Sequence, residues 1–390
     1  MNIASLTLDF IEIPLRAPFE TSFGVETVKS CWLLTVESDG VRGYAETVAD
    51  VEPLYGPETH ATVYYALKNH LWPRLQSLDI NDPQAIWQAF GAIRGNNMAK
   101  AGLEMAIWDW YARSQKQPLY ALLGGDPHRT EVPVGVSIGI QPNDMALIDM
   151  AQAYWQKGYQ RLKIKIRPGR DIGPLQALRR AMGPDVPIMA DANSAYQLQD
   201  AQGIAQWDDL SLMMIEQPLG ATDIIDHATL AQSLRTPICL DESIESDDDA
   251  RVAIKIGAAA IMNIKLGRVG GHQMARRIHD LAYAKGVPVW CGGMLETGIG
   301  RAHNLHMTTL PGFTLPGDTS ASDRYFYEDL IDPPFELSDR GTLRVPSGDG
   351  IGVEPDPVRL KKFSQYHETW RGGKTSAKGG VPHGGQGARF

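Results

Sequence analysis

Five ionisable side chains follow short apolar runs at a nearly constant interval in the second half of the sequence. They are Lys165, Asp191, Glu216, Asp241 and Lys265, separated by 26, 25, 25 and 24 residues. One strand, one helix and two loops of a (β/α)8 barrel of ~250 residues take about that many residues. The interval therefore predicts that each side chain lies at the carboxyl end of its own strand, where barrel enzymes build their sites.

The three acidic residues of this series are of the type that binds a hard divalent cation. Mg²⁺ and Mn²⁺ prefer carboxylate oxygens and leave room for water or substrate, whereas structural zinc takes Cys and His. A single Asp after an apolar run is commonly a helix cap or a turn residue instead. Because all five residues keep the interval, we predict that Asp191, Glu216 and Asp241 bind a metal together.

Two of the lysines are expected to face each other across the barrel. If the run at 132–138 is the first strand, Lys165 ends the second strand and Lys265 the sixth, and these strands are opposed in an eight-stranded barrel. Lys163 points to the same face as Lys165, because it lies two residues earlier. A neighbouring cation and a metal lower the pKa of a lysine, so we predict Lys165 as a base and Lys163 as its electrostatic partner. The alternative is that Lys163 reaches the rim and only balances charge.

These residue types match the needs of one reaction, the removal of a proton from the carbon next to a carboxylate. Loss of that proton builds a doubly charged ene-diolate, which a cation at the carboxylate stabilises. A base on one face takes the proton. A second lysine on the opposite face either returns a proton, which inverts the carbon, or stays a fixed cation beside the intermediate.

The elements predicted around these residues form two domains. Residues 1–130 are predicted to be α+β, with strands over 2–50, a mobile loop at 19–24 and helices over 58–125, the clearest of them at 98–113. Residues 131–325 alternate amphipathic segments with short apolar runs, which indicates βαβ units and a buried parallel sheet. The runs are 132–138, 161–166, 186–190, 212–215, 238–240, 260–264 and 288–291. A C-terminal segment follows at 326–370, and the Gly-rich tail at 371–390 is predicted to be disordered, because it cannot bury enough apolar surface.

The bulk composition narrows the class of protein. The chain has 390 residues, 43% of them hydrophobic, and a net charge of −9, which is typical of a globular protein and argues against nucleic acid as a partner. No apolar run is long enough to span a membrane, and the N-terminus lacks the features of a signal peptide. The three cysteines are far apart and lack metal-site spacing, so we expect free thiols and a cytoplasmic protein.

At these residues the sequence resembles the enolase superfamily, in its muconate-lactonizing subgroup and its N-acylamino acid racemase / o-succinylbenzoate synthase family. Sites of this superfamily are known to use a Lys base with Mg²⁺. The resemblance spans about residues 3–355 and is carried by Phe19–Gly24, Glu26–Thr27, Gly135–Gln141, Lys163–Gly169, Asp191–Tyr196, Ile215–Leu219, Cys239–Ser243, Cys291–Glu296 and Gly298–Arg301.

The resemblance implies a (β/α)7β barrel under an N-terminal α+β capping domain, to which the C-terminal segment returns. It implies that Asp191, Glu216 and Asp241 hold Mg²⁺ or Mn²⁺, that Lys165 and Lys265 are the acid/base pair, and that the protein is a homo-oligomer acting on a small carboxylate. It also places several residues near the substrate, namely Phe19, Phe23, Tyr55, Ser137 and Met294. Asn193 is also predicted to be a substrate-binding residue, and it is expected to orient the groups around it. Ala49 stands where many relatives carry Met, which predicts a wider pocket.

Three functions remain open at this point. The first is racemisation of N-acylamino acids, above all N-succinylamino acids, with both lysines exchanging protons. The second is o-succinylbenzoate synthesis in menaquinone biosynthesis, where Lys165 moves the proton on one face and Lys265 stabilises the anion. The third is a barrel that binds a metal or ligand without turnover, since a fold does not dictate a function. Lys163, Lys165 and Lys265 argue against the third, because a pure metal site needs no basic residues.

Overall fold

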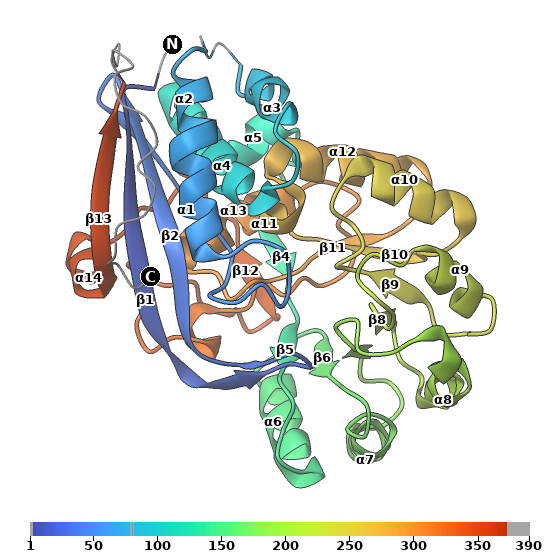
Figure 1. The fold of residues 1–390 in the computed structure, drawn as a ribbon. Coiled ribbons are helices and arrows are strands. Elements are labelled where there is room, and N and C mark those ends of the chain that lie inside the picture. Colours follow the sequence, from blue (N-terminus) through green and yellow to red (C-terminus); the bar gives the residue numbers. More distant parts are fainter. Residues whose placement is uncertain (1–2, 79, 81, 373–390) are drawn as a thin grey trace, which may run out of the picture.

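Two sheets organise the molecule, an antiparallel sheet in the N-terminal domain and a curled parallel sheet beside it (Figure 1). The computed structural model describes residues 3–78, 80 and 82–372. Within these ranges no helix is both long enough and apolar enough to cross a membrane.

The first sheet and five helices make up the capping domain. The sheet has the order β13-β1-β2-β3 and is antiparallel throughout. Its strands are β1 (Ser5–Glu20), β2 (Val25–Ser38), β3 (Val41–Glu46) and β13 (Ser364–Arg371). The helices are α1 (His60–Ala66), α2 (Trp72–Leu75), α3 (Gln84–Gly91), α4 (Asn97–Ser114) and α5 (Leu119–Leu123), with a π-helical turn at Leu67–Leu71.

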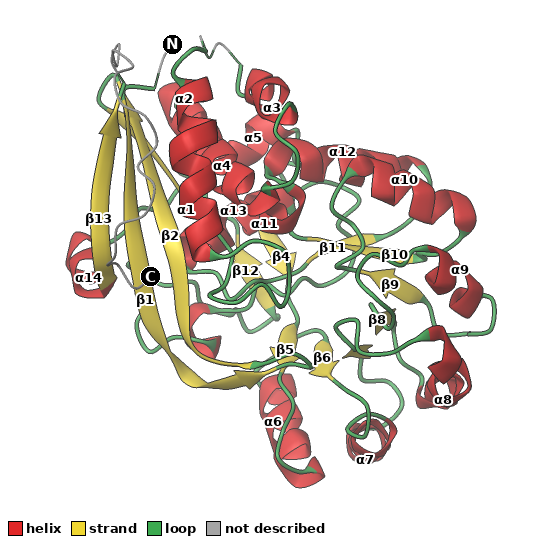
Figure 2. Ribbon diagram, in the orientation of Figure 1, coloured by secondary structure: helices red, strands yellow, loops and turns green. Residues whose placement is uncertain are grey.

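The second sheet has seven parallel strands in chain order, as an alternating βα pattern requires. They are β5 (Val136–Ile138), β6 (Leu162–Lys165), β7 (Ile188–Asp191), β8 (Ile215–Glu216), β9 (Ile238–Leu240), β10 (Ile261–Ile264) and β11 (Val289–Cys291). Helices α6 to α10 lie around the outside of the curled sheet (Figure 2). The helices of this part are α6 (Asp144–Gln156), α7 (Ile172–Met182), α8 (Ala201–Ile204), α9 (Ile225–Ala231), α10 (Asp247–Ile256), α11 (Leu266–Val269), α12 (His272–Ala284) and α13 (Gly298–Met307). The predicted (β/α)7β barrel with a capping domain is confirmed.

The predicted first strand at 132–138 is in fact two strands. β4 (Glu131–Pro133) pairs antiparallel with β12 (Thr342–Arg344), and only β5 joins the barrel. The gap between β5 and β11 is closed by a segment without regular strand structure. Gly135 N donates to Gly317 O at 2.7 Å, and Asp318 N donates to Cys291 O at 2.8 Å.

The hairpin formed by β1 and β2 reaches over the barrel beside β5 and β6 (Figure 1). Phe19 belongs to β1, so the connection predicted as a loop at 19–24 is reduced to residues 21–24. Ile140 N donates to Glu20 O at 2.9 Å, and Arg167 forms an ion pair with Glu20 at 3.0 Å. The tip of the hairpin is therefore attached to the loops at the carboxyl end of the barrel.

Helix α4 joins the cap to the barrel. Nearly every residue from Met98 to Ala112 is buried, as expected of a helix with neighbours on all sides. Its Glu104 accepts hydrogen bonds from the backbone N–H groups of His272 and Gln273, both at 2.9 Å, at the start of α12. These bonds fix the cap relative to the strand ends of the barrel.

The close packing of α4 on β3 depends on Gly43. A Cβ atom there would lie 2.3 Å from both Ala106 O and Trp110 N, which are backbone atoms that cannot move alone. We expect Gly43→Ala to lower the free energy of unfolding by about 1–3 kcal/mol, as overpacking does. Urea denaturation of this variant beside Gly173→Ala, whose Cβ would meet nothing within 4 Å, provides the measurement. Equal stability of the two variants would contradict the packing argument.

The C-terminal segment contains a short 3₁₀ helix at Ser322–Arg324, then β12, α14 (Pro357–Phe363) and β13. Strand β13 pairs with β1 from Ser5–Arg371 to Ile11–Ser364. Arg371 therefore ends a strand, whereas the prediction placed it in the tail. Residues 373–390 of the predicted tail lie outside the described residues.

Candidate active site

The predicted lysines lie on the inner face of β6 and beside β10. Arg161, Lys163 and Lys165 alternate along β6 and the residue before it, and all three are buried. Alternate residues of a strand share a face, so the barrel interior receives a column of three cations. Lys265 directly follows β10 and is also buried.

The predicted acidic residues stand at the ends of the three strands between them. Asp191 and Glu216 are the last residues of β7 and β8, where they pair in register, and Asp241 directly follows β9. The three side chains are fully buried. All five residues of the regularly spaced series therefore lie at the carboxyl end of the barrel, as their spacing predicts.

Each outer carboxylate of this row contacts one of the two predicted acid/base lysines. Lys165 Nζ donates to Asp191 Oδ2 at 2.7 Å, and Lys265 Nζ donates to Asp241 Oδ2 at 2.8 Å. Lys163 Nζ lies 3.0 Å from oxygens of both Asp191 and Glu216. The lysines and carboxylates thus form one connected network.

Burial and neighbouring charges give the lysines different proton affinities. Burial lowers the pKa of Lys165, although Asp191 opposes the shift, and the Lys163 ammonium lowers it further. Burial would lower the pKa of Lys163 too, but Asp191, Asp318 and Glu216 hold that pKa well above its ordinary value. These two directions agree with the roles predicted from the sequence, in which Lys163 remains a cation beside a more easily deprotonated Lys165; the roles themselves stay predictions.

The three carboxylates have the chemistry of a divalent-cation site. Burial raises the pKa of Glu216, and repulsion from Asp191 adds to the shift. A nearby carboxylate, Glu242, has a buried Oε2 without a hydrogen-bond partner. Within the described ranges no group of three His, Cys, Asp or Glu side chains is arranged to hold a metal ion. Lysines, Arg268 and two asparagines contact the oxygens of these three carboxylates. The donor set fits a hard cation in type, number and strand position, and such an ion would compete with the basic side chains.

A cavity of about 50 Å³ lies above this network. Every residue predicted to bind substrate lines it, together with the three lysines: Phe19, Phe23, Tyr55, Ser137, Asn193, Met294, Lys163, Lys165 and Lys265. Asn193 accepts from Lys165 Nζ at 2.7 Å and donates to Glu242 at 3.0 Å. Ser137 Oγ is buried and has no hydrogen-bond partner. The substrate-binding roles themselves stay predictions.

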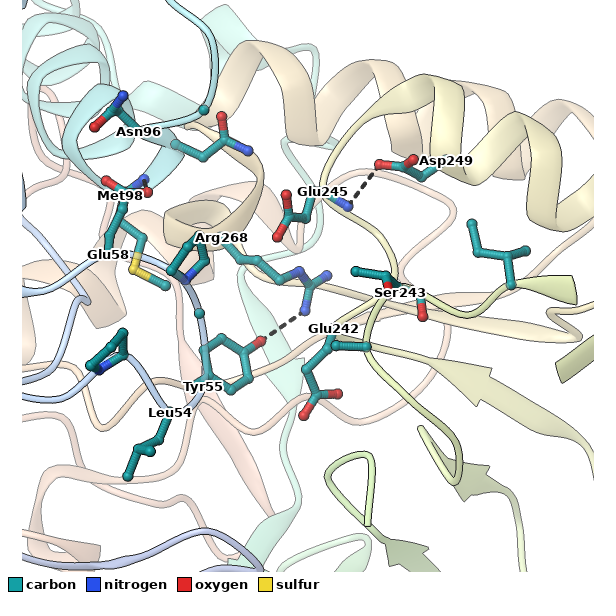
Figure 3. A pocket seen from close by; sticks show the side chains of 18 residues that line it. Leu54, Tyr55, Glu58, Asn96, Met98, Glu242, Ser243, Glu245, Asp249 and Arg268 are labelled. Atoms are coloured by element: carbon teal, nitrogen blue, oxygen red, sulfur yellow. Dashed lines mark hydrogen bonds between the residues drawn. The ribbon is translucent and has the colours of Figure 1, made fainter. Parts of the chain in front are cut away.

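Tyr55 separates this cavity from a larger one of about 520 Å³, since it lines both. Its hydroxyl accepts from Arg268 Nη1 at 3.1 Å (Figure 3). It also accepts from Lys265 Nζ at 3.0 Å and donates to Asp241 at 3.2 Å. Tyr55 is carried by the cap, so this contact closes the cap onto the catalytic network.

Two residues that contact the lysines and carboxylates of the site, Arg268 and Asp318, were not predicted from the sequence as site residues. Arg268 contacts Asp241 directly, and its only signal was its place three residues after Lys265. Asp318 binds Lys163 at 2.8 Å, a contact that no spacing along the chain reveals.

The expectation for Ala49 is also revised. Ala49 is fully buried and does not line the catalytic cavity, whereas the neighbouring Asp50 does. The cavity therefore has the Asp50 carboxylate at this place, and the small side chain of Ala49 does not widen it. Glu26 of β2 lines the same wall.

The capping domain and the curled parallel sheet together define a fold of the enolase type. The model of the mandelate racemase / muconate lactonizing enzyme N-terminal domain matches residues 6–124, and that of the enolase C-terminal domain-like family matches residues 146–359. The chain belongs to the enolase superfamily, which confirms the resemblance seen in its motifs.

Relatives of known name agree with this assignment. The o-succinylbenzoate synthase of Geobacillus kaustophilus is 50% identical, over 94% of this chain and 97% of the relative. The N-succinylamino acid racemase of Thermus thermophilus is 46% identical, over 94% of this chain and 99% of the relative. A solved enolase-superfamily structure from Listeria innocua superposes with a TM-score of 0.91 at 41% identity, over 95% of this chain and 99% of that one.

Proposed function

We propose that this protein racemises N-acylamino acids, with N-succinylamino acids as the substrate class, in the presence of Mg²⁺, Mn²⁺ or another divalent cation. One observation carries the proposal: Lys165 and Lys265 line a single cavity from strands that have three others between them. Bases on two sides of a carbon are what inversion through an ene-diolate requires. The name of the Thermus thermophilus relative supports the substrate class.

In the proposed mechanism the two lysines exchange protons with the α-carbon. Lys165 Nζ takes the proton from one face, and Lys265 Nζ delivers a proton to the other; the roles reverse for the opposite enantiomer. Lys163 stays protonated and favours the neutral form of Lys165. Ser137 Oγ is free to donate a hydrogen bond to the substrate, and Phe19 and Phe23 exclude water from the cavity.

Asp191, Glu216 and Asp241 would hold the divalent cation, which would neutralise the negative charge that develops on the substrate carboxylate. The proposal also includes a cytoplasmic location and a homo-oligomeric assembly, with no nucleic acid or membrane as a partner. These stay predictions.

A second candidate function is o-succinylbenzoate synthesis, the activity in the name of the Geobacillus kaustophilus relative. There Lys165 alone moves the proton, and Lys265 remains a cation beside the anion. The ion pair of Lys265 with Asp241 favours such a fixed cation. The pKa of Lys265 is raised although burial opposes the shift, because Tyr55 and nearby carboxylates favour the charged form. The same cavity can serve both reactions, since both pass through an ene-diolate.

Incubation in D2O tests the proposal. The purified protein with Mg²⁺ is expected to place solvent deuterium at the α-carbon of both N-succinyl-L-norleucine and its D-enantiomer, and to convert each to the racemate. Proton NMR follows exchange, and polarimetry follows inversion. Turnover of the menaquinone precursor that the synthase dehydrates, without exchange in either enantiomer, would favour the second function. If the protein catalyses neither deuterium exchange, nor inversion, nor dehydration of the menaquinone precursor, both candidate functions are contradicted.

A further inference from the structure

One wall of the catalytic cavity is acidic and comes from the cap. Glu26 of β2 and Asp50, which follows β3, both line the cavity beside Lys165 and Lys265. Neither carboxylate has a role in the mechanism proposed above. Their presence in a cavity that must also admit an anionic substrate calls for a separate explanation.

The same two carboxylates line a groove that leads away from the cavity. This groove encloses about 310 Å³ and shares Phe23, Glu26 and Asp50 with the cavity. Its other acidic residues are Glu12 and Glu52, and none of the described residues that line it is basic. The groove thus carries negative charge from the catalytic cavity to the outside.

The remaining lining of the groove is largely aliphatic. Val25, Val28, Val51 and Leu54 belong to it, and each is exposed, Val51 by 64%. Val25 and Val51 directly neighbour Glu26 and Asp50 along the chain, so aliphatic side chains accompany the carboxylates where the cavity meets the groove. That combination suits a flexible aliphatic stem with a cationic tip.

The two shared carboxylates have no direct hydrogen-bonding partner among the described residues. In the part of the chain that the structure describes, neither Glu26 nor Asp50 forms a side-chain hydrogen bond or an ion pair. Nearby lysines favour the charged forms of both carboxylates, Lys29 first among them, but Lys29 Nζ donates its hydrogen bond to Met294 O at 2.9 Å. Burial raises the pKa of Glu26 to about 7, with repulsion from Asp50 next in size. Both carboxylates would gain from a cation supplied by a ligand.

A second feature of the cavity also points to a ligand. Ser137 Oγ lines the same cavity, at the end of β5, and the side chain is only 4% exposed. The hydroxyl has no hydrogen-bond partner. A buried hydroxyl without a partner is costly unless a bound molecule satisfies it.

We propose that Glu26 and Asp50 select N-acylamino acids whose side chain carries a positive charge, with the charged end of that side chain between the two carboxylates, where the cavity meets the groove. The inference rests on the proposed function, of which it specifies the substrate class. Lysine and arginine derivatives have the required shape, a chain of methylene groups with a cation at its end. Anionic side chains are rejected by repulsion, and neutral ones leave the carboxylates unpaired.

Matched pairs of substrates measure this selection. N-succinyl-L-lysine is compared with N-succinyl-L-norleucine, which has the same four-carbon stem, and N-succinyl-L-arginine with the uncharged citrulline derivative. We expect the wild-type kcat/KM to be at least about tenfold higher for the cationic member of each pair, because hydrogen bonds between charged groups are stronger than neutral ones. The double variant Glu26→Gln/Asp50→Asn is expected to bring both ratios close to one.

The control variant is Glu37→Gln, which lies on the same strand as Glu26 but lines neither the cavity nor the groove. It is expected to keep the wild-type ratios. If the double variant does not fold, the single variants Glu26→Gln and Asp50→Asn replace it, each with an intermediate ratio. Equal or better use of the neutral substrates by the wild-type protein would overturn the inference but leave the racemase proposal intact. Failure to turn over any N-succinylamino acid would overturn the proposed function itself.

Discussion

Removal of either Lys165 or Lys265 is expected to abolish racemisation and to leave proton exchange with one enantiomer only. The two lysines line one cavity from opposite parts of the sheet, so each serves one face of the α-carbon. In Lys165→Ala, Lys265 still removes and returns a proton on its own face, but nothing protonates the other. Racemisation should fall by about 10²–10⁴-fold, the usual contribution of a general acid or base. Polarimetry measures the loss, and proton NMR in D2O detects the remaining exchange.

The complementary result is expected for Lys265→Ala, with exchange confined to the other enantiomer. Lys255→Ala is the matched control, because Lys255 is exposed near the end of α10, and it should racemise at the wild-type rate. Circular dichroism checks that each variant folds, since removal of Lys165 or Lys265 leaves a buried Asp without one of its partners. Exchange of both enantiomers by either single variant would rule out a mechanism with one lysine on each face.

The same variants separate the two candidate functions. If the protein is chiefly a synthase, Lys165→Ala should lose the dehydration entirely, because the proton is taken and delivered on one face. Lys265→Met, which removes only the charge from a side chain of similar length, should weaken the same reaction without changing where deuterium enters. A racemase, in which each single variant keeps exchange with one enantiomer only, is thus distinguishable from a synthase that depends on one base.

The positions of the residues predicted to be catalytic could be inferred because the same strand–helix unit is repeated along a barrel. Each strand and its helix form a unit of nearly constant length, so residues 24–26 apart occupy equivalent places. Lys163 followed from the alternation of side chains along β6. These inferences need only short-range geometry, which the sequence reports directly.

Contacts between distant segments were not predictable in this way. Asp318 reaches Lys163 from the irregular segment that closes the barrel, and such a segment has no period to follow. Asp50 lies in the connection between β3 and α1, where side chains neither alternate nor follow a helical repeat, so the sequence could not tell whether Ala49 or Asp50 faces the cavity. The split between β4 and β5 was missed because the partner of β4 is β12, about 210 residues further along the chain.

Loss of one central carboxylate is expected to remove the divalent cation from the site. Glu216 stands between Asp191 and Asp241 in the row of strands, is fully buried, and accepts from Asn263 at 2.8 Å. Glu216→Gln keeps the size of the side chain but removes one negative charge. Loss of a residue that merely orients a ligand costs about 10–100-fold in metal affinity, so the loss of a ligand should cost at least about 100-fold.

Isothermal titration of the EDTA-treated protein with Mg²⁺ measures this affinity without reference to catalysis. Glu245→Gln is the matched control, because Glu245 is exposed near the same face but contacts none of the three carboxylates, and it should bind Mg²⁺ as the wild-type protein does. The effect has a definite sign: without the Glu216 charge, Lys163 keeps Asp191 and Asp318 as partners, so the cation must compete with an ammonium for fewer oxygens. Unchanged Mg²⁺ affinity in Glu216→Gln would place the metal elsewhere, and the row of carboxylates would then serve only to neutralise the lysines.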